Sequence, residues 1–268
     1  MRRLLIAHLL LVAAGFGEQS RYRMAALGGL VANATFGLLK VAILFATVEA
    51  AGGELAGYDV DMMSAYIWIS QGMLGSVNLM GRVDIAERIR TGDVTVDFLR
   101  PLDVHTAMIA HELGRSLFSL LPRGLPSVLI GALLVGMATP DSLAAYALGA
   151  VSLLLAMVLS AATVYLVAAA GFWIVETRGI QLLYMVAAGF LAGLFVPLWL
   201  FPGWLQVVAL ATPFPAMVMF PTDILSGRTT GLDAVELVGA QLLWLTAMVS
   251  VGQLMTRRGR RHLEVQGG

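Results

Sequence analysis

The feature that most constrains this chain is a series of six long apolar stretches, separated by short segments that carry most of its arginines. A helix needs roughly 20 apolar residues to cross hydrocarbon, and lipid cannot satisfy exposed backbone groups. Only 13% of the 268 residues are charged, against about 25% in a soluble domain. The sequence therefore predicts one all-α, multi-pass membrane domain over 1–268, and excludes a cytosolic enzyme or a nucleic-acid reader. The six predicted transmembrane helices are Met24–Val48, Met62–Met80, a segment within Ser116–Met137 that holds Pro122, Arg123 and Pro126, Leu143–Ile174, Ile180–Leu200 and Leu232–Met255.

The arginines gather at both chain ends and between alternate spans. Positively charged residues are retained on the cytoplasmic side of a membrane. The loop after the first span has acidic residues and no basic one. An even number of spans also places both termini on the same side of the membrane. Both termini, including the tail 256–268, are therefore predicted to be cytoplasmic. The arginines assigned to that side are Arg2, Arg3, Arg21, Arg23, Arg82, Arg88, Arg90, Arg100, Arg115, Arg123, Arg178, Arg257, Arg258, Arg260 and Arg261.

The first residues allow two interpretations. Two arginines followed by the apolar run Leu4–Phe16 are typical of a signal peptide. Cleavage there would leave Arg21 and Arg23 on the outer side of the first span, against the charge rule. We therefore favour an interfacial helix over 1–22, lying along the inner leaflet.

The segment 201–231, before the last span, is apolar yet rich in proline. Proline removes a backbone donor and interrupts a continuous helix. Short broken helices that dip into the outer leaflet would explain the aromatic side chains better than a loop in water. We predict a re-entrant hairpin, with an ordinary extracellular loop as the alternative. The prolines expected to break the helix are Pro197, Pro202, Pro213, Pro215 and Pro221, and Trp204 and Phe214 are among the aromatic residues.

Catalytic chemistry finds no support in the sequence. There is no cysteine, and the only lysine, Lys40, follows a leucine, so the lysine of a phosphate-binding P-loop is missing. His111 and Glu112 begin like a zinc-protease motif, but Arg115 stands where the second histidine belongs. We expect no catalytic residue, no metal site and no cofactor in this chain.

The loop 82–104 combines charge with apolar side chains on the predicted cytoplasmic side. It begins as an amphipathic helix in which Glu87 and Arg90, three residues apart, can pair. Gly92 suits the left-handed end of that helix. The following stretch, Asp93–Leu99, is expected to be extended and partly apolar. Such a loop is suited to docking a partner, although a solvated positive loop is the alternative.

A few polar residues fall within the predicted spans. Lys40 lies in the outer part of the first span, where it either reaches the outer surface or lines a transport path. Gln71 and Asn78 share one face of the second span and are weak candidates for the path, helix packing being the alternative. Gly189 and Gly193 form a G-x-x-x-G pattern in the fifth span, which allows two helix backbones to approach closely.

Two segments resemble a known family. The run IRTGDVTVDFLRPLDV is similar to the cytoplasmic signature of type-2 ATP-binding-cassette (ABC-2) permeases, in the six-span branch with the pattern I-x-x-G-x-[IV]-x-x-x-L-L-R-P-L. Phe98 departs from it where leucine is commoner. The segment from Pro197 to Gly227 resembles the proline-rich region before the family's last span. The matching residues are Ile89, Gly92, Val94, Leu99, Arg100, Pro101 and Leu102 in the first segment, and Pro202, Trp204, Pro213, Phe214, Pro221 and Gly227 in the second.

The resemblance implies half of an ATP-driven exporter in a bacterial inner membrane. Such a permease pairs with a second permease, identical or homologous, and with two copies of a separate ATPase that holds the ATP and magnesium. The family mostly exports drugs, lipids or other amphipathic molecules. The residues expected to couple the ATPase to transport are Ile89, Arg90, Gly92, Asp93, Val94, Leu99, Arg100, Pro101 and Leu102.

Two other functions compete with the exporter. An ion-coupled secondary transporter would need an ionisable residue in a span core, where the sequence offers only Lys40 and no acidic residue. A membrane assembly protein without transport activity would use the loop 82–104 to bind some other protein.

Overall fold

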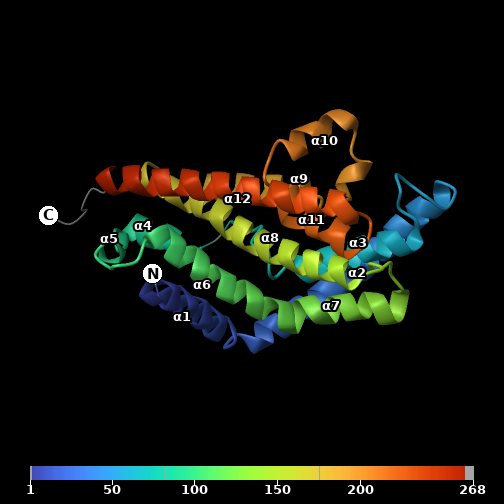
Figure 1. Ribbon diagram of the computed structural model, residues 1–268, viewed down its shortest axis with the longest axis horizontal. Coiled ribbons are helices and arrows are strands. Elements are labelled where there is room, and N and C mark those ends of the chain that lie inside the picture. The colour runs from blue at the N-terminus through green and yellow to red at the C-terminus, as the bar shows by residue number, and fades with distance from the viewer. Residues whose placement is uncertain (1, 82, 175, 263–268) are drawn as a thin grey trace.

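The computed structural model describes residues 2–81, 83–174 and 176–262, and throughout these ranges the secondary structure is helical, without a strand (Figure 1). The α-helices are α1 Arg2–Gln19, α2 Arg23–Ala50, α3 Val60–Met73, α4 Asp84–Thr91, α5 Val94–Asp97, α6 Val104–Ser119, α7 Leu125–Ile130, α8 Leu143–Ala169, α9 Arg178–Leu191, α10 Gly203–Leu210, α11 Pro215–Leu225 and α12 Gly231–Gly259. Short 3-10 helices cover Ala170–Phe172, Leu198–Leu200 and Arg260–His262, and π-helical turns cover Leu120–Gly124 and Gly131–Val135.

Four helices in this part of the chain are long and apolar enough to cross a membrane. A fifth candidate is the pair α10 and α11, which is bent by 107° at its break. These candidates make the chain a multi-pass membrane protein, while the count of six full-length spans is not reproduced. The four single candidates are Arg23–Ala50, Val104–Val135, Leu143–Phe172 and Gly231–His262.

The predicted second and fifth spans are shorter than expected. Helices α3 and α9 have 14 residues each, which at 1.5 Å per residue is about 21 Å. Helix α3 ends at Met73, so Asn78 lies beyond it and does not share a helix face with Gln71. Gly193 lies beyond α9 in the left-handed conformation, so the predicted G-x-x-x-G helix contact is wrong.

The predicted third span begins earlier than expected, at Val104, and its prolines do not interrupt it. Pro122 lies in the first π-helical turn, and Pro126 stands at the start of α7. A proline inside a helix removes one hydrogen bond and crowds the preceding turn, which a widened turn can accommodate. The helix therefore continues through both prolines to Val135.

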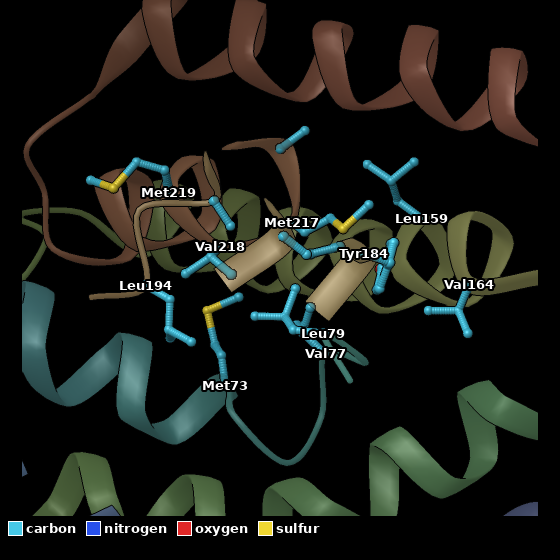
Figure 2. Packing of buried hydrophobic residues seen from close by; sticks show 14 of the residues in the cluster. Met73, Val77, Leu79, Leu159, Val164, Tyr184, Leu194, Met217, Val218 and Met219 are labelled. Carbon is cyan, nitrogen blue, oxygen red and sulfur yellow. The ribbon is translucent and has the colours of Figure 1, made fainter. Parts of the chain in front are cut away.

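Helix α11 is the centre of the core. Its residues from Pro215 to Ile224 are all buried, and it packs on α3, α8 and α12. Figure 2 shows Met217, Val218 and Met219 of α11 beside Met73 and Leu159. The amide of Gln241 in α12 adds a polar link, since it donates to the carbonyl oxygens of Ser152 and Ala216 at 3.0 and 2.8 Å.

The proline-rich segment is broken, as predicted, but not at every proline. Pro202 precedes α10, and Pro215 is the first residue of α11, where its missing N–H costs nothing. Pro221, in contrast, lies inside α11 and does not end it. Pro213 and Phe214 form the bend, and Trp204 on α10 is 69% exposed.

The predicted interfacial segment 1–22 forms helix α1, which lies along α6 (Figure 1). The two backbones touch, because a Cβ added at Gly15 or at Gly114 would overlap a carbonyl oxygen of the other helix. Glu18 pairs with His111 at 3.2 Å between carboxylate and imidazole, and Phe16 packs edge-on against Phe118. Helix α1 is thus fixed to the protein along its length.

One end of the molecule gathers the start of α1, helices α4 and α5 and the end of α12 (Figure 1). We call it the arginine-rich end, after its exposed arginines on α4, α12 and the loops. The tail predicted to begin at residue 256 continues α12 as a helix to Gly259 and ends in the 3-10 turn Arg260–His262; residues 263–268 lie outside the described part.

Candidate functional site

The predicted coupling segment forms a compact pair of helices at the arginine-rich end. The apolar face of α4 buries Ile85 and Ile89, and Val94 of α5 is fully buried beside them. Helix α4 packs on α8 and the 3-10 turn that follows it, where a Cβ added at Gly171 would lie 3.2 Å from the Ile89 side chain. The segment is therefore anchored to the membrane helices through its own core.

The turn between α4 and α5 follows one prediction and contradicts another. Gly92 has φ 83°, the left-handed conformation expected for the end of α4. Val94–Asp97 is a short helix, so the extended stretch predicted from Asp93 is wrong. The chain turns back because the Thr95 N–H and hydroxyl both bond the Gly92 carbonyl, at 3.1 and 2.9 Å, which brings Val94 into the core.

Ion pairs hold the turn in place. The Arg88 guanidinium donates to the Asp97 carboxylate at 2.6 Å, and Arg100 approaches the same carboxylate at 3.3 Å. The hydrogen bond to Asp97 raises the pKa of the Arg88 guanidinium. The predicted pair of Glu87 and Arg90 is present, and the hydrogen bond from Arg90 lowers the pKa of Glu87. Arg82, at the beginning of the predicted segment, lies outside the described residues.

Beyond this framework the segment exposes an apolar tip. Val96 is 52% exposed and Leu99 is 83% exposed, although the buried Val94 lies only two and five residues before them. Arg100 and Pro101 next to them are also exposed. We call Val96, Leu99, Arg100 and Pro101 the coupling tip. A rigidly held apolar tip among charges is the kind of surface that a partner protein covers.

A cavity of about 370 Å³ separates the coupling segment from the end of α12. On one side Phe98 stacks on Phe172 at 6.3 Å between ring centroids, and the Arg260 guanidinium lies 5.3 Å from the Phe98 ring. Asp103, which also lines the cavity, caps α6 and accepts a hydrogen bond from Gln253 at 2.7 Å. The lining residues are Phe98, Arg100, Pro101, Leu102, Asp103, Val104, Gln253, Thr256, Arg257 and Arg260.

The three candidate path residues lie apart from this segment. The Lys40 ammonium donates to the carbonyl oxygen of Leu194 and lies 5.8 Å from the Tyr66 ring centroid, so it is turned into the protein. Gln71 is buried on α3. Asn78 sits in the irregular segment after α3, where its backbone N–H bonds the Ser160 hydroxyl at 3.1 Å.

One buried acidic residue escaped the sequence reading. Asp223 on α11 is 1% exposed, and its carboxylate accepts a hydrogen bond from the Trp199 indole at 2.9 Å. The Arg228 guanidinium lies over the rings of Tyr58 and Trp199, at 4.4 and 5.5 Å from their centroids. The signal in the sequence is an aspartate inside the apolar run Ala216–Leu225, which lies in the predicted re-entrant hairpin and not in a predicted span.

Within the described ranges, no group of three or more histidine, aspartate or glutamate side chains could hold a metal ion. The site consists of an exposed apolar tip on an anchored helical segment, with several buried polar groups elsewhere in the protein.

Comparison with known proteins gives the family. No curated protein and no solved structure matches the chain significantly. The family described as ABC-2 family transporter protein matches residues 32–267, which include α3 to α12 and the whole coupling segment. The chain belongs to the ABC-2 family of transporter proteins.

Proposed function

We propose that this chain is the transmembrane subunit of an ATP-driven exporter of amphipathic small molecules, drugs or lipids. It would act with a second permease, identical or homologous, and with two copies of a separate ATPase. Membership of a transporter family and the multi-pass helical fold support the permease role. The sequence lacks a P-loop lysine, so the energy must be supplied by a partner chain that binds ATP and magnesium.

The arrangement in the membrane is part of this proposal. We infer a single permease domain in a bacterial inner membrane with both termini and the arginine-rich end in the cytoplasm, following the charge rule. The short helices α3 and α9 would complete six crossings with their irregular flanking segments. The bent pair α10 and α11 would enter the outer leaflet and return. Protein burial of α11 supports this, because broken helices need their free backbone groups covered.

The observation that carries the proposal is the coupling tip on its anchored base. Leu99 is 83% exposed, while Ile89 and Val94 on the same segment are buried against the membrane helices. A partner that pushes on Leu99 therefore pushes on α8 through the packed face of α4. The residues Ile89, Arg90, Gly92, Asp93, Val94, Leu99, Arg100, Pro101 and Leu102 form this proposed coupling element.

A substitution that places a negative charge on the coupling tip tests this proposal. In vesicles that contain the permease and its ATPase, Leu99→Glu should reduce ATPase binding and ATP-driven export at least about tenfold, because the carboxylate would have to be desolvated under the partner. Copurification and uptake of a fluorescent amphipath into inverted vesicles measure the two effects. The thermal unfolding temperature should stay unchanged, because the side chain is exposed.

A matched control is Arg178→Gln, since Arg178, the first residue of α9, is exposed and pairs only loosely with Glu176 at 3.7 Å. It should leave both readouts as in the wild type. Full ATPase binding and full export by Leu99→Glu would show that the tip is not the coupling surface. Vesicles with this chain alone should not pump at all.

A further inference from the structure

An arginine lies inside one of the long apolar helices. Arg123 falls between Pro122 and Gly124 in the first π-helical turn of the candidate span Val104–Val135. The turn is wider than an α-helical turn, and such turns are frequent at functional sites. A guanidinium in an apolar span is costly unless something pairs with it. Polar partners for Arg123 are therefore expected close to its guanidinium.

Glycines open the space that the guanidinium occupies. A Cβ added at Gly29 of α2 would overlap the Arg123 guanidinium, and one added at Gly75 would lie 3.3 Å from it. Gly29 lies about 9 Å along α2 from its start, at 1.5 Å per residue. The guanidinium thus lies against Gly29, inside the second candidate span Arg23–Ala50, and not against the arginine at the start of that span.

The polar neighbours give this cation little compensation. One terminal nitrogen of Arg123 donates to the Asn33 side-chain oxygen at 3.5 Å, the outer limit of a hydrogen bond. The Asn33 amide nitrogen donates to the Gln71 carbonyl at 2.9 Å, which leaves the oxygen of Asn33 facing Arg123. Among the described residues, the Arg123 Nε is buried without a hydrogen-bond partner, and no carboxylate forms an ion pair with the side chain.

Lys40, a second cation within a candidate span of the described residues, already has its partners. The Lys40 ammonium donates to the Leu194 carbonyl and lies near the Tyr66 ring, so the protein itself supplies its partners. The Arg123 side chain is only half-buried and can be reached from outside the chain. Of these two cations, Arg123 is the one whose charge is little compensated by the protein and whose side chain a ligand can reach.

From these contacts we propose that Arg123 binds the anionic head group of the transported amphipath, a phosphate, sulfonate or carboxylate whose tail stays in the hydrocarbon. A planar guanidinium suits such oxyanions because it can offer two parallel N–H donors. An amphipath brings its charge to this depth with its tail already in hydrocarbon, whereas a free ion would have to leave water. The inference rests on the proposed transport function and adds the charge of the substrate to it.

Export is measured in vesicles of neutral lipid that hold the permease and its ATPase. The probes are two fluorescent amphipaths with the same tail, one with a sulfonate head and one with an uncharged head. Arg123→Gln should reduce export of the sulfonate probe at least tenfold and change export of the neutral probe less than twofold. Arg123→Lys keeps the charge and should retain an intermediate rate. Equal loss with both probes, or no loss with either, overturns the proposal.

A second pair of variants tests the site without removing the arginine. Gly29→Ala places a methyl group on the guanidinium and should reproduce the selective loss. Gly28→Ala, whose Cβ has no neighbour within 4 Å, is the matched control and should export both probes normally. Selective loss in Gly28→Ala but not in Gly29→Ala would contradict the geometry.

Binding to the permease alone separates this inference from the proposed function. Wild-type permease in neutral nanodiscs should bind the sulfonate probe at least tenfold more tightly than Arg123→Gln does. If Arg123-dependent binding is seen but no ATP-driven export of any probe occurs, the transport function fails and the anion site stands. If the neutral probe is exported, and the sulfonate probe binds through Arg123 without being exported, the site holds a resident lipid and the substrate assignment is wrong.

Discussion

The segment from Asp84 to Leu102 leaves apolar side chains in the open, whereas the segment from Trp199 to Arg228 encloses its charged ones. In the first, the ion pairs lie around an exposed tip, and Leu99 is 83% exposed. In the second, the Asp223 carboxylate accepts a hydrogen bond from Trp199, and the Arg228 guanidinium lies over aromatic rings. The first arrangement leaves surface for a partner, and the second uses its polar groups to fix its own shape.

One left-handed glycine in the coupling segment, Gly92, and one shortly before the second segment, Gly193, allow the largest test of this difference. Gly193 has φ 73°, and an added Cβ would lie 2.9 Å from the Met219 sulfur and 3.2 Å from the Leu198 nitrogen. Gly92 has φ 83° with no atom within 4 Å of that position. Alanine at either site costs about 1–2 kcal/mol in conformation. Gly193→Ala should lose roughly 1–3 kcal/mol more through overpacking.

Thermal or denaturant unfolding in one detergent measures both variants. Gly193→Ala should unfold at the lower temperature, and Gly92→Ala should remain closer to the wild type. Equal destabilisation would mean that the region before α10 is packed no more tightly than the coupling segment.

The hydrogen bond of the buried aspartate provides the next test. Trp199→Phe keeps an aromatic ring but removes the indole N–H that faces Asp223. A buried carboxylate that loses a donor costs about 1–3 kcal/mol, so the free energy of unfolding should fall by that amount. Trp204→Phe on the same segment is the control, since Trp204 is 69% exposed. A wild-type unfolding curve for Trp199→Phe would show that this bond does not stabilise the fold.

The smallest effect concerns the exposed pair in α4. The hydrogen bond from Arg90 lowers the pKa of Glu87 below its ordinary value of 4.5, so the pair stabilises α4 at pH values above 4.5. That contribution is lost as the pH falls through the lowered pKa, where the carboxylate takes up a proton. Backbone chemical shifts of α4 between pH 7 and pH 3 should report the loss. Glu87→Gln should remove this pH dependence, and an identical titration in both proteins would contradict the assignment.

Local chemistry near the backbone was readable from the sequence. The left-handed turn at Gly92, the pair of Glu87 and Arg90, and the broken segment around Pro202 follow from residue type and spacing alone. Features that depend on neighbours far along the chain could not be predicted from the sequence. Helix α5 forms because Val94 finds a buried place, and Pro221 stays inside α11 because packing on α3 and α8 outweighs its local cost.

The candidate site divides in the same way. The lengths of the apolar runs located the helices but not their ends, so α3 and α9 are shorter than the runs that predicted them. The argument against an ion-coupled transporter considered acidic residues in the cores of the six predicted spans. Asp223 is buried on α11, outside those spans, and that argument therefore did not include it. Hydropathy averages conceal such a residue, because one carboxylate scarcely changes the mean of a ten-residue apolar stretch.

The touching backbones of α1 and α6 have a mechanical consequence. The backbones of α1 and α6 touch at Gly15 and at Gly114 with no side chain between them, so we expect the two helices to move together as a rigid pair. In the proposed transport cycle, a displacement of the start of α6 would carry along Leu5, Leu9 and Leu10, which are exposed on α1. If α1 lies in the inner leaflet, as we propose, stiffer lipids should then slow ATP-driven transport at the same ATP concentration.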